Sequence, residues 1–163
     1  VQEALSKGEA VNSNKRDLKI HLLGPLQTNK VKKVFSLFDY IHSLDRLSLA
    51  EKLSREAQER GYCPKIFVQV NTGKEEQKSG VFPENLKGFI NLSQKTYELD
   101  VVGLMCIPPI DDDPTYHFNK LKLLANKNKI DELSIGMSGD YEKALQFNPT
   151  YIRLGTILFG KRS

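Results

Sequence analysis

The sequence predicts an α/β fold with a parallel β-sheet. Short apolar runs rich in β-branched residues alternate with stretches of helical periodicity along the 163 residues. Successive strands are about 20 to 30 residues apart, which is the spacing of βαβ units. Each of the last two expected strands also ends in small residues, a pattern typical of turns at the edge of such a sheet.

Six strands are expected, and the third, with Ile-Phe-Val-Gln-Val, is the densest in β-forming residues. The strands are at residues 19–23, 40–44, 65–71, 101–107, 133–135 and 151–154. Helices are expected at 29–38, 48–60, 83–97, 116–128 and 139–147, with a further helical stretch at 1–8. Gly61 marks the end of the helix at 48–60.

Two architectures accommodate six strands. One is an open six-stranded sheet, and the other is a (β/α)8 barrel, which needs eight strands and typically about 250 residues. The chain starts at Val1, without methionine, inside an amphipathic pattern that has no capping residue before it. This start favours a barrel from which two βα units are absent at the amino terminus, so we expect the chain to be a fragment.

Composition indicates one globular domain, with 39% hydrophobic and 27% charged residues. The net charge of +4 is mild, and the 24 basic and 20 acidic residues are interspersed, so no nucleic-acid partner is expected. No apolar run reaches membrane-spanning length. The two cysteines, Cys63 and Cys106, follow no metal-ligand spacing, so we expect no metal site and a reducing, cytoplasmic location.

The turns after the last two strands carry Gly136, Ser138, Gly155 and Thr156. Small residues let backbone N–H groups approach an anion, and Ser138 is positioned to cap the helix that follows it. In barrels of this type the loops after strands 7 and 8 frequently bind phosphate. Either turn alone is more typical of ordinary turn and cap residues, but two on successive strands favour a phosphate site.

Polar side chains near the strand ends are further candidates for a site, because active groups in barrels lie at the carboxyl ends of strands. Arg153 is flanked by Ile152 and Leu154, and a buried arginine needs either a carboxylate partner or a ligand. His21 is a ligand contact or a hydrogen-bonded interior histidine. Gln69 and Asn71 share one strand face, toward either the barrel mouth or a neighbouring loop. The chain shows no Ser-His-Asp set and no closely spaced carboxylate pair, and we expect no catalytic residue.

Five short motifs occur in an order that points to a known family. They are His-Leu-Leu-Gly-Pro-Leu-Gln-Thr-Asn-Lys at 21–30, Gln-Val-Asn at 69–71 with Lys-Ser-Gly at 78–80, Gly-Leu-Met at 103–105, Leu-Ser-Ile-Gly-Met-Ser-Gly-Asp at 133–140, and Ile-Arg-Leu-Gly-Thr at 152–156 with Phe-Gly at 159–160. With these motifs the chain resembles the pyridoxal phosphate homeostasis proteins, the YggS/PROSC group, along nearly all of its length.

The resemblance implies the barrel shared with the N-terminal domain of alanine racemase, which is the PLP fold type III, here with roughly strands 3–8 only. It implies pyridoxal 5'-phosphate (PLP) as cofactor, with the phosphate on the Ser138 turn and on Gly155 and Thr156, and the pyridine nitrogen facing Arg153. The expected cofactor-binding residues are Ser138, Arg153, Gly155, Thr156, Met137, His21 and Met105.

The resemblance also implies a non-catalytic carrier or regulator of intracellular PLP, monomeric at full length. A barrel that lacks two strands exposes two sheet edges, so we expect a shortened chain to associate with itself. Members bind PLP through a lysine on the first strand, in a Val-Ser-Lys-type motif that this chain does not contain. Two alternatives remain open from the sequence: a fragment of a PLP-dependent, racemase-like enzyme, and a non-catalytic phosphate-binding α/β module.

Overall fold

The computed structural model describes residues 18–160, so the helix expected at 1–8 lies outside the described residues. These residues form one sheet of six parallel strands in the order β1-β2-β3-β4-β5-β6. The six expected strands are thereby confirmed. Every strand lies beside the next one in the chain, which is the order of a barrel, whereas a doubly wound sheet reverses direction at a switch point.

The strands are β1 (His21–Leu22), β2 (Tyr40–Leu44), β3 (Lys65–Gln69), β4 (Val101–Met105), β5 (Glu132–Met137) and β6 (Tyr151–Arg153). Four of the six strands are shorter than the runs that predicted them, β2 has the expected bounds, and β5 is longer. The helical elements are the 3-10 helix η1 (Thr28–Lys30), α2 (Val31–Val34), α3 (Leu47–Arg60), α4 (Leu86–Lys95), α5 (Pro114–Asn128), α6 (Tyr141–Leu145) and α7 (Thr156–Phe159). None of the helices between residues 18 and 160 is long and apolar enough to cross a membrane.

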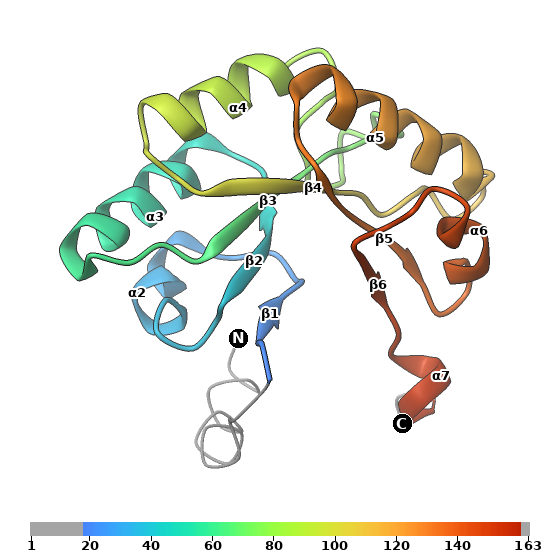
Figure 1. The fold of residues 1–163 in the computed structure, drawn as a ribbon, viewed down its shortest axis with the longest axis horizontal. Helices are drawn as coiled ribbons and strands as arrows, with labels where there is room; N and C mark the ends of the chain where they lie inside the picture. Colours follow the sequence, from blue (N-terminus) through green and yellow to red (C-terminus); the bar gives the residue numbers. More distant parts are fainter. Residues whose placement is uncertain (1–17, 161–163) are drawn as a thin grey trace.

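The sheet is curled, with the helices α2 to α6 on its outer face and an inner face that they leave open (Figure 1). The curl brings side chains from the two ends of the sheet together. Tyr151 on β6 lies 5.0 Å from His21 on β1, measured between ring centroids, and 5.7 Å from Tyr40 on β2. The described part of the chain is therefore an open half-barrel, and side chains from its first and last strands meet in a common interior.

Local signals explain where the longer helices begin and end. Gly61 ends α3 in the left-handed conformation, with φ of 65°. The helix α5 begins two residues before its expected start, because the Asp113 side chain accepts a hydrogen bond from Thr115 N and Pro114 occupies the first turn. Between the sheet and these helices lies a core of fully buried Leu, Ile, Val and Phe side chains.

The short helical elements depart most from expectation. The helix expected at 29–38 is a 3-10 turn followed by the single turn α2, and α6 begins at Tyr141 instead of residue 139. The helix α7 was expected to be a turn. Four residues are about one helical turn, too few to show a hydrophobic repeat of 3.6 residues.

Candidate functional site

A cavity of about 1120 Å³ lies on the inner face of the sheet, at the carboxyl ends of the strands. Its lining comes from β1, β2, β4, β5, β6 and α7. All seven residues singled out from the sequence line it: His21, Met105, Met137, Ser138, Arg153, Gly155 and Thr156. The structure thus brings together, in one cavity, residues that are up to 135 positions apart in the sequence, from His21 to Thr156.

Ser138 joins the two turns that the sequence singled out. Its Oγ accepts a hydrogen bond from Gly155 N at 3.1 Å and a longer one from Ile157 N at 3.4 Å. The expectation that Ser138 caps the next helix was wrong, since α6 has Asp140 at its N-cap position and no side-chain cap bond. Ser138 instead caps the start of α7, because the curl of the sheet places the end of β5 beside the end of β6.

Gly136 lies inside β5, away from the cavity lining, with φ of 84°. A Cβ at this position would lie 2.7 Å from Ala144 Cβ on α6. Its small size therefore serves the packing of α6 against β5. Of the four small residues in the two turns, Ser138, Gly155 and Thr156 remain candidates for holding an anion.

Arg153 reaches across the interior and is held by two neutral acceptors. Nη1 donates to Ser134 Oγ and Nη2 donates to the Cys106 carbonyl oxygen, both at 2.9 Å. No ion pair joins Arg153 to a carboxylate of residues 18–160. Burial lowers the pKa of Arg153, while Cys106 and Asp140 oppose that shift. The geometry thus leaves a positive charge, fixed in orientation, at the cavity wall.

The remaining predicted residues form the side and floor of the cavity. Met105 is buried and Met137 is exposed at the rim. His21 Nδ1 lies 2.9 Å from His42 Nε2, so His21 is a hydrogen-bonded interior histidine that also lines the cavity. Burial lowers the pKa of His42 to about 3, with smaller contributions from His21 and Arg153.

His42 and Tyr151 are among the lining residues that sequence reasoning missed. A signal for both was present. Side chains alternate between the two faces of a strand, so Tyr151 shares the face of Arg153, and His42 lies two residues after Tyr40. The alternation could have found them once the inward face of each strand was known.

Of the two alternatives for Gln69 and Asn71, the structure shows contacts with a neighbouring loop. Asn71 Nδ2 donates to the Glu75 carbonyl oxygen at 2.7 Å, and Asn71 Oδ1 accepts from Glu75 N at 3.1 Å. Gln69 Nε2 donates to the Ser79 carbonyl oxygen at 3.3 Å. Both side chains therefore brace the polar loop after β3, and neither lines the cavity.

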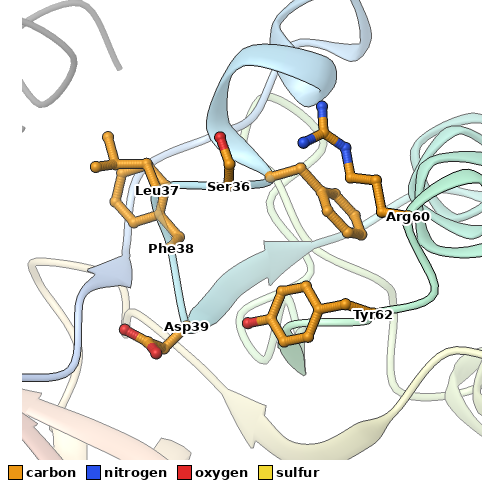
Figure 2. A pocket seen from close by; sticks show the side chains of 7 residues that line it. Ser36, Leu37, Phe38, Asp39, Arg60 and Tyr62 are labelled. Atoms are coloured by element: carbon orange, nitrogen blue, oxygen red, sulfur yellow. The ribbon is translucent and has the colours of Figure 1, made fainter.

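A second, smaller pocket of about 310 Å³ lies at the opposite rim, where Asp39 precedes β2 (Figure 2). Arg60 points away from Asp39 and Tyr62 in this view, and its Nη2 donates to the Lys32 carbonyl oxygen at 3.0 Å. Asp39 accepts from Ile20 N at 2.9 Å and pairs with Lys19. These charged groups have partners within the chain, so the larger cavity is the better candidate for a site.

The donor set of the larger cavity suits an anionic organic ligand. Arg153 can only donate, and the hydroxyls of Ser138 and Thr156 add further donors on one side. Met105, Ile107 and Met137 supply apolar surface for a ring. Among residues 18–160 no group of three or more His, Cys, Asp or Glu side chains could hold a metal ion.

Comparisons with known proteins define the class first. The family model of the alanine racemase N-terminal domain matches residues 1–163. An alanine racemase from Clostridium difficile 630 has the same fold, with a TM-score of 0.73 at 20% identity over 96% of this chain and 43% of its own. This likeness agrees with the barrel order of the strands.

The particular family follows from closer relatives. Pyridoxal phosphate homeostasis proteins of Aquifex aeolicus and Synechocystis are 40% and 42% identical, over 99% of this chain and 74% and 78% of their own lengths. The structure of PipY from Synechococcus elongatus with PLP bound has a TM-score of 0.84 at 36% identity, over 98% of this chain and 78% of its own. The chain belongs to the pyridoxal phosphate homeostasis protein family.

Proposed function

We propose that this chain binds PLP in the large cavity and serves intracellular PLP homeostasis as a non-catalytic carrier or regulator. The observation that carries the proposal is Arg153, a half-buried cation whose hydrogen-bond partners are neutral, facing a cavity beside the joined turns of Ser138 and Gly155. A dianionic phosphate ester with a basic ring nitrogen complements this set of donors. PLP bound to the related PipY supports the choice of ligand.

In this proposal, Ser138, Gly155 and Thr156 hold the phosphate and Arg153 donates to the pyridine nitrogen. Met105 and Met137 contact the ring through apolar surface, and His21 contacts the ligand from β1. PLP supplies an aldehyde and an electron-accepting ring when bound. A guanidinium can only donate, so it keeps the ring nitrogen unprotonated and weakens the ring as an electron sink. That property suits a carrier better than an enzyme.

The experiment needs a probe that cannot react with surface lysines. We choose 4-deoxypyridoxine 5'-phosphate, which keeps the ring and the phosphate but has no aldehyde, and compare it with 4-deoxypyridoxine by isothermal titration calorimetry. The phosphate-free compound should bind at least about tenfold more weakly, because each charge-assisted hydrogen bond contributes roughly 1.5 to 3 kcal/mol. Equal affinity for the two compounds would contradict the phosphate assignment.

Arg153→Gln tests the ring contact, with Arg60→Gln at the opposite rim as its matched control. The first substitution should weaken binding of the phosphorylated probe and the second should leave it unchanged. A racemization assay with alanine and PLP tests the non-catalytic role. Turnover above that of free PLP, lost in Arg153→Gln, would favour the racemase-like alternative.

We further propose that the chain acts in the cytoplasm and associates with itself. Free Cys63 and Cys106 support a reducing compartment. The helix α7 supports self-association, because Ile157, Leu158 and Phe159 are exposed. Sedimentation velocity across a range of concentrations tests the association, and Phe159→Ser should shift the chain toward monomer. A sedimentation coefficient that does not change with concentration would contradict it.

A further inference from the structure

Two histidines on neighbouring strands are in direct contact at the cavity wall. His21 Nδ1 on β1 lies 2.9 Å from His42 Nε2 on β2. Between two neutral imidazoles, one of these nitrogens must carry the proton and the other must accept it. The contact therefore couples the tautomer of His21 to that of His42.

The position of His42 is fixed from behind by packing. Its ring stacks on Phe67 with 4.2 Å between centroids and an angle of 3° between planes. Phe67 in turn lies across Gly103 on β4, where a Cβ would come within 2.0 Å of Phe67 Cε1. Gly103 thus makes the space that lets Phe67 support His42, which is fully buried.

The buried surroundings of His42 distinguish the two tautomers. Its Nδ1 has no hydrogen-bond partner among the described residues. If His21 donated to His42 Nε2, the proton of neutral His42 would be on Nδ1, as a buried N–H without an acceptor, which is rare in proteins. If His42 Nε2 donates instead, Nδ1 is a bare nitrogen with no N–H to satisfy.

The nitrogen of His21 that does not contact His42 is Nε2. No hydrogen bond to Nε2 of His21 occurs within residues 18–160, and this atom is not among the buried polar atoms without a partner. Nε2 therefore has no hydrogen-bond partner among the described residues, on a side chain that lines the cavity. The rings of Tyr40, stacked at 4.1 Å, and Tyr151, at 5.0 Å, hold the imidazole in place.

We propose that His42 is a positioning residue that fixes His21 as the neutral Nε2–H tautomer, so that His21 presents a hydrogen-bond donor to an acceptor atom of the ligand in the cavity. The ligand role rests on the proposed function, whereas the tautomer is a property of the chain without ligand. Both imidazoles are kept neutral by burial, which lowers the pKa of each, and by the positive charge of Arg153 near His42. Asp39 opposes the shift at His21.

The tautomers can be read directly from imidazole 15N chemical shifts in long-range 1H–15N spectra of the ligand-free chain at pH 7. We expect His21 and His42 both as neutral Nε2–H tautomers. His117, which lies between Thr72 Oγ1 at 2.9 Å and Asp112 Oδ2 at 3.2 Å, serves as an internal reference away from the pair. A proton on His21 Nδ1, or a cationic His21, would overturn the proposal.

Two substitutions separate positioning from simple packing. In His42→Gln the amide N–H stands where Nε2–H was, so the His21 tautomer should be retained. In His42→Leu the donor is lost, and His21 should become a mixture of tautomers. Binding of 4-deoxypyridoxine 5'-phosphate should fall in His42→Leu by the reciprocal of the Nε2–H fraction of His21 read from the spectra, about twofold for an equal mixture, and stay near wild type in His42→Gln.

The outcomes keep the two proposals apart. Equal loss of binding in both variants, with His21 unchanged in the spectra, would show that His42 acts through packing alone and would overturn the positioning role. A wild-type chain that does not bind the probe would overturn the proposed function and the ligand role of His21. The spectra of that same ligand-free chain would still decide the tautomer.

Discussion

The hydroxyl of Ser138, just past β5, accepts a hydrogen bond from the backbone N–H of Gly155, just past β6, at 3.1 Å. The two residues are 17 positions apart and belong to different turns. The bond makes one unit of these turns and fixes the start of α7, and with it Thr156. An anion-binding site built from both turns depends on this bond for its shape.

Thr156→Val should therefore weaken binding of 4-deoxypyridoxine 5'-phosphate without a change in stability. Thr156 is exposed, so the substitution removes a hydroxyl and leaves the packing as it is. We expect a loss of about 1.5 to 3 kcal/mol in binding free energy, the contribution of a hydrogen bond to a charged group. Calorimetric titration measures the affinity, and a thermal melt checks the fold.

Thr96→Val, at an exposed position after α4, is the matched control and should bind as the unsubstituted chain does. Ser138→Ala should differ from both, because it removes the acceptor shared by Gly155 N and Ile157 N. We expect lower affinity together with a lower melting temperature. Unchanged affinity in Thr156→Val and Ser138→Ala would exclude the turns as the phosphate site.

Gly103→Ala should destabilise the chain by about 1 to 3 kcal/mol, the usual cost of overpacking a core. The added Cβ would meet the Phe67 ring at 2.0 Å, and Phe67 is fully buried, so its ring would have to be displaced within the core. Urea unfolding monitored by circular dichroism measures the free energy of unfolding.

Gly88→Ala provides the opposite control. Gly88 lies on the exposed side of α4, and a Cβ added there would have no neighbouring atom within 4 Å, so alanine should stabilise the chain by about 0.5 to 1 kcal/mol. A Gly103→Ala chain as stable as the unsubstituted one would mean that Phe67 does not need the space over Gly103.

The alternation of apolar strands and helices was enough to predict all six strands, because each strand has a buried face with period-two side chains or a short, continuous apolar run. The seven expected residues could be singled out because the family motifs coincide with strand ends, and they line one cavity. What the sequence could not provide was the curl of the sheet. The bond between Ser138 and Gly155 depends on that curl, so Ser138 was assigned to the neighbouring helix in the chain instead of to α7.

The interior pair of His21 and His42 escaped sequence reasoning for a similar reason. No local sequence rule sets the register of parallel strands. In this register His21 pairs with Tyr40, and this places His42, two residues further along β2 on the same face, within hydrogen-bond distance of His21. The partners of Arg153 were also out of reach, since Ser134 and the Cys106 carbonyl lie on two other strands or their ends.

Stability should fall with pH below about 6.5 because of His42. Its pKa is about 3 in the folded chain and near 6.5 when exposed, so between these values the unfolded chain binds a proton that the folded chain does not. The contribution of His42 to the free energy of unfolding is then fully present above pH 6.5. It declines toward pH 3 by up to about 1.4 kcal/mol per pH unit. Urea unfolding at pH 7, 6, 5 and 4 measures the slope.

His42→Gln removes this titration and keeps the donor to His21. The difference in unfolding free energy between the two chains should therefore change with pH in favour of the variant at low pH. Groups that do not contact His42 titrate alike in both chains and cancel in the difference. A difference that stays constant from pH 7 to 4 would show that His42 is not held neutral in the folded chain.

The positions of the lysines determine whether PLP can be bound covalently. Attack on the PLP aldehyde needs an unprotonated amine directed at the site. Lys19 and Lys65 lie at the amino ends of their strands, at the rim opposite the cavity. Lys74 pairs with Glu84 at 3.1 Å and Lys78 pairs with Glu75 at 2.7 Å, and these ion pairs use the protonated form. No lysine of residues 18–160 lines the cavity.

We predict that residues 18–160 hold PLP by non-covalent contacts alone and that it exchanges freely. Incubation with PLP, borohydride reduction and peptide mass spectrometry should give substoichiometric pyridoxyl adducts spread over several exposed lysines. Dialysis before reduction should remove most of them, because a ligand without a covalent bond leaves with the buffer. Arg153→Gln should lose bound PLP without changing the adduct pattern, since the adducts form outside the cavity. A stoichiometric adduct on one lysine that resists dialysis and is lost in Arg153→Gln would show that a lysine does reach the site, and Lys74 is the first position to inspect.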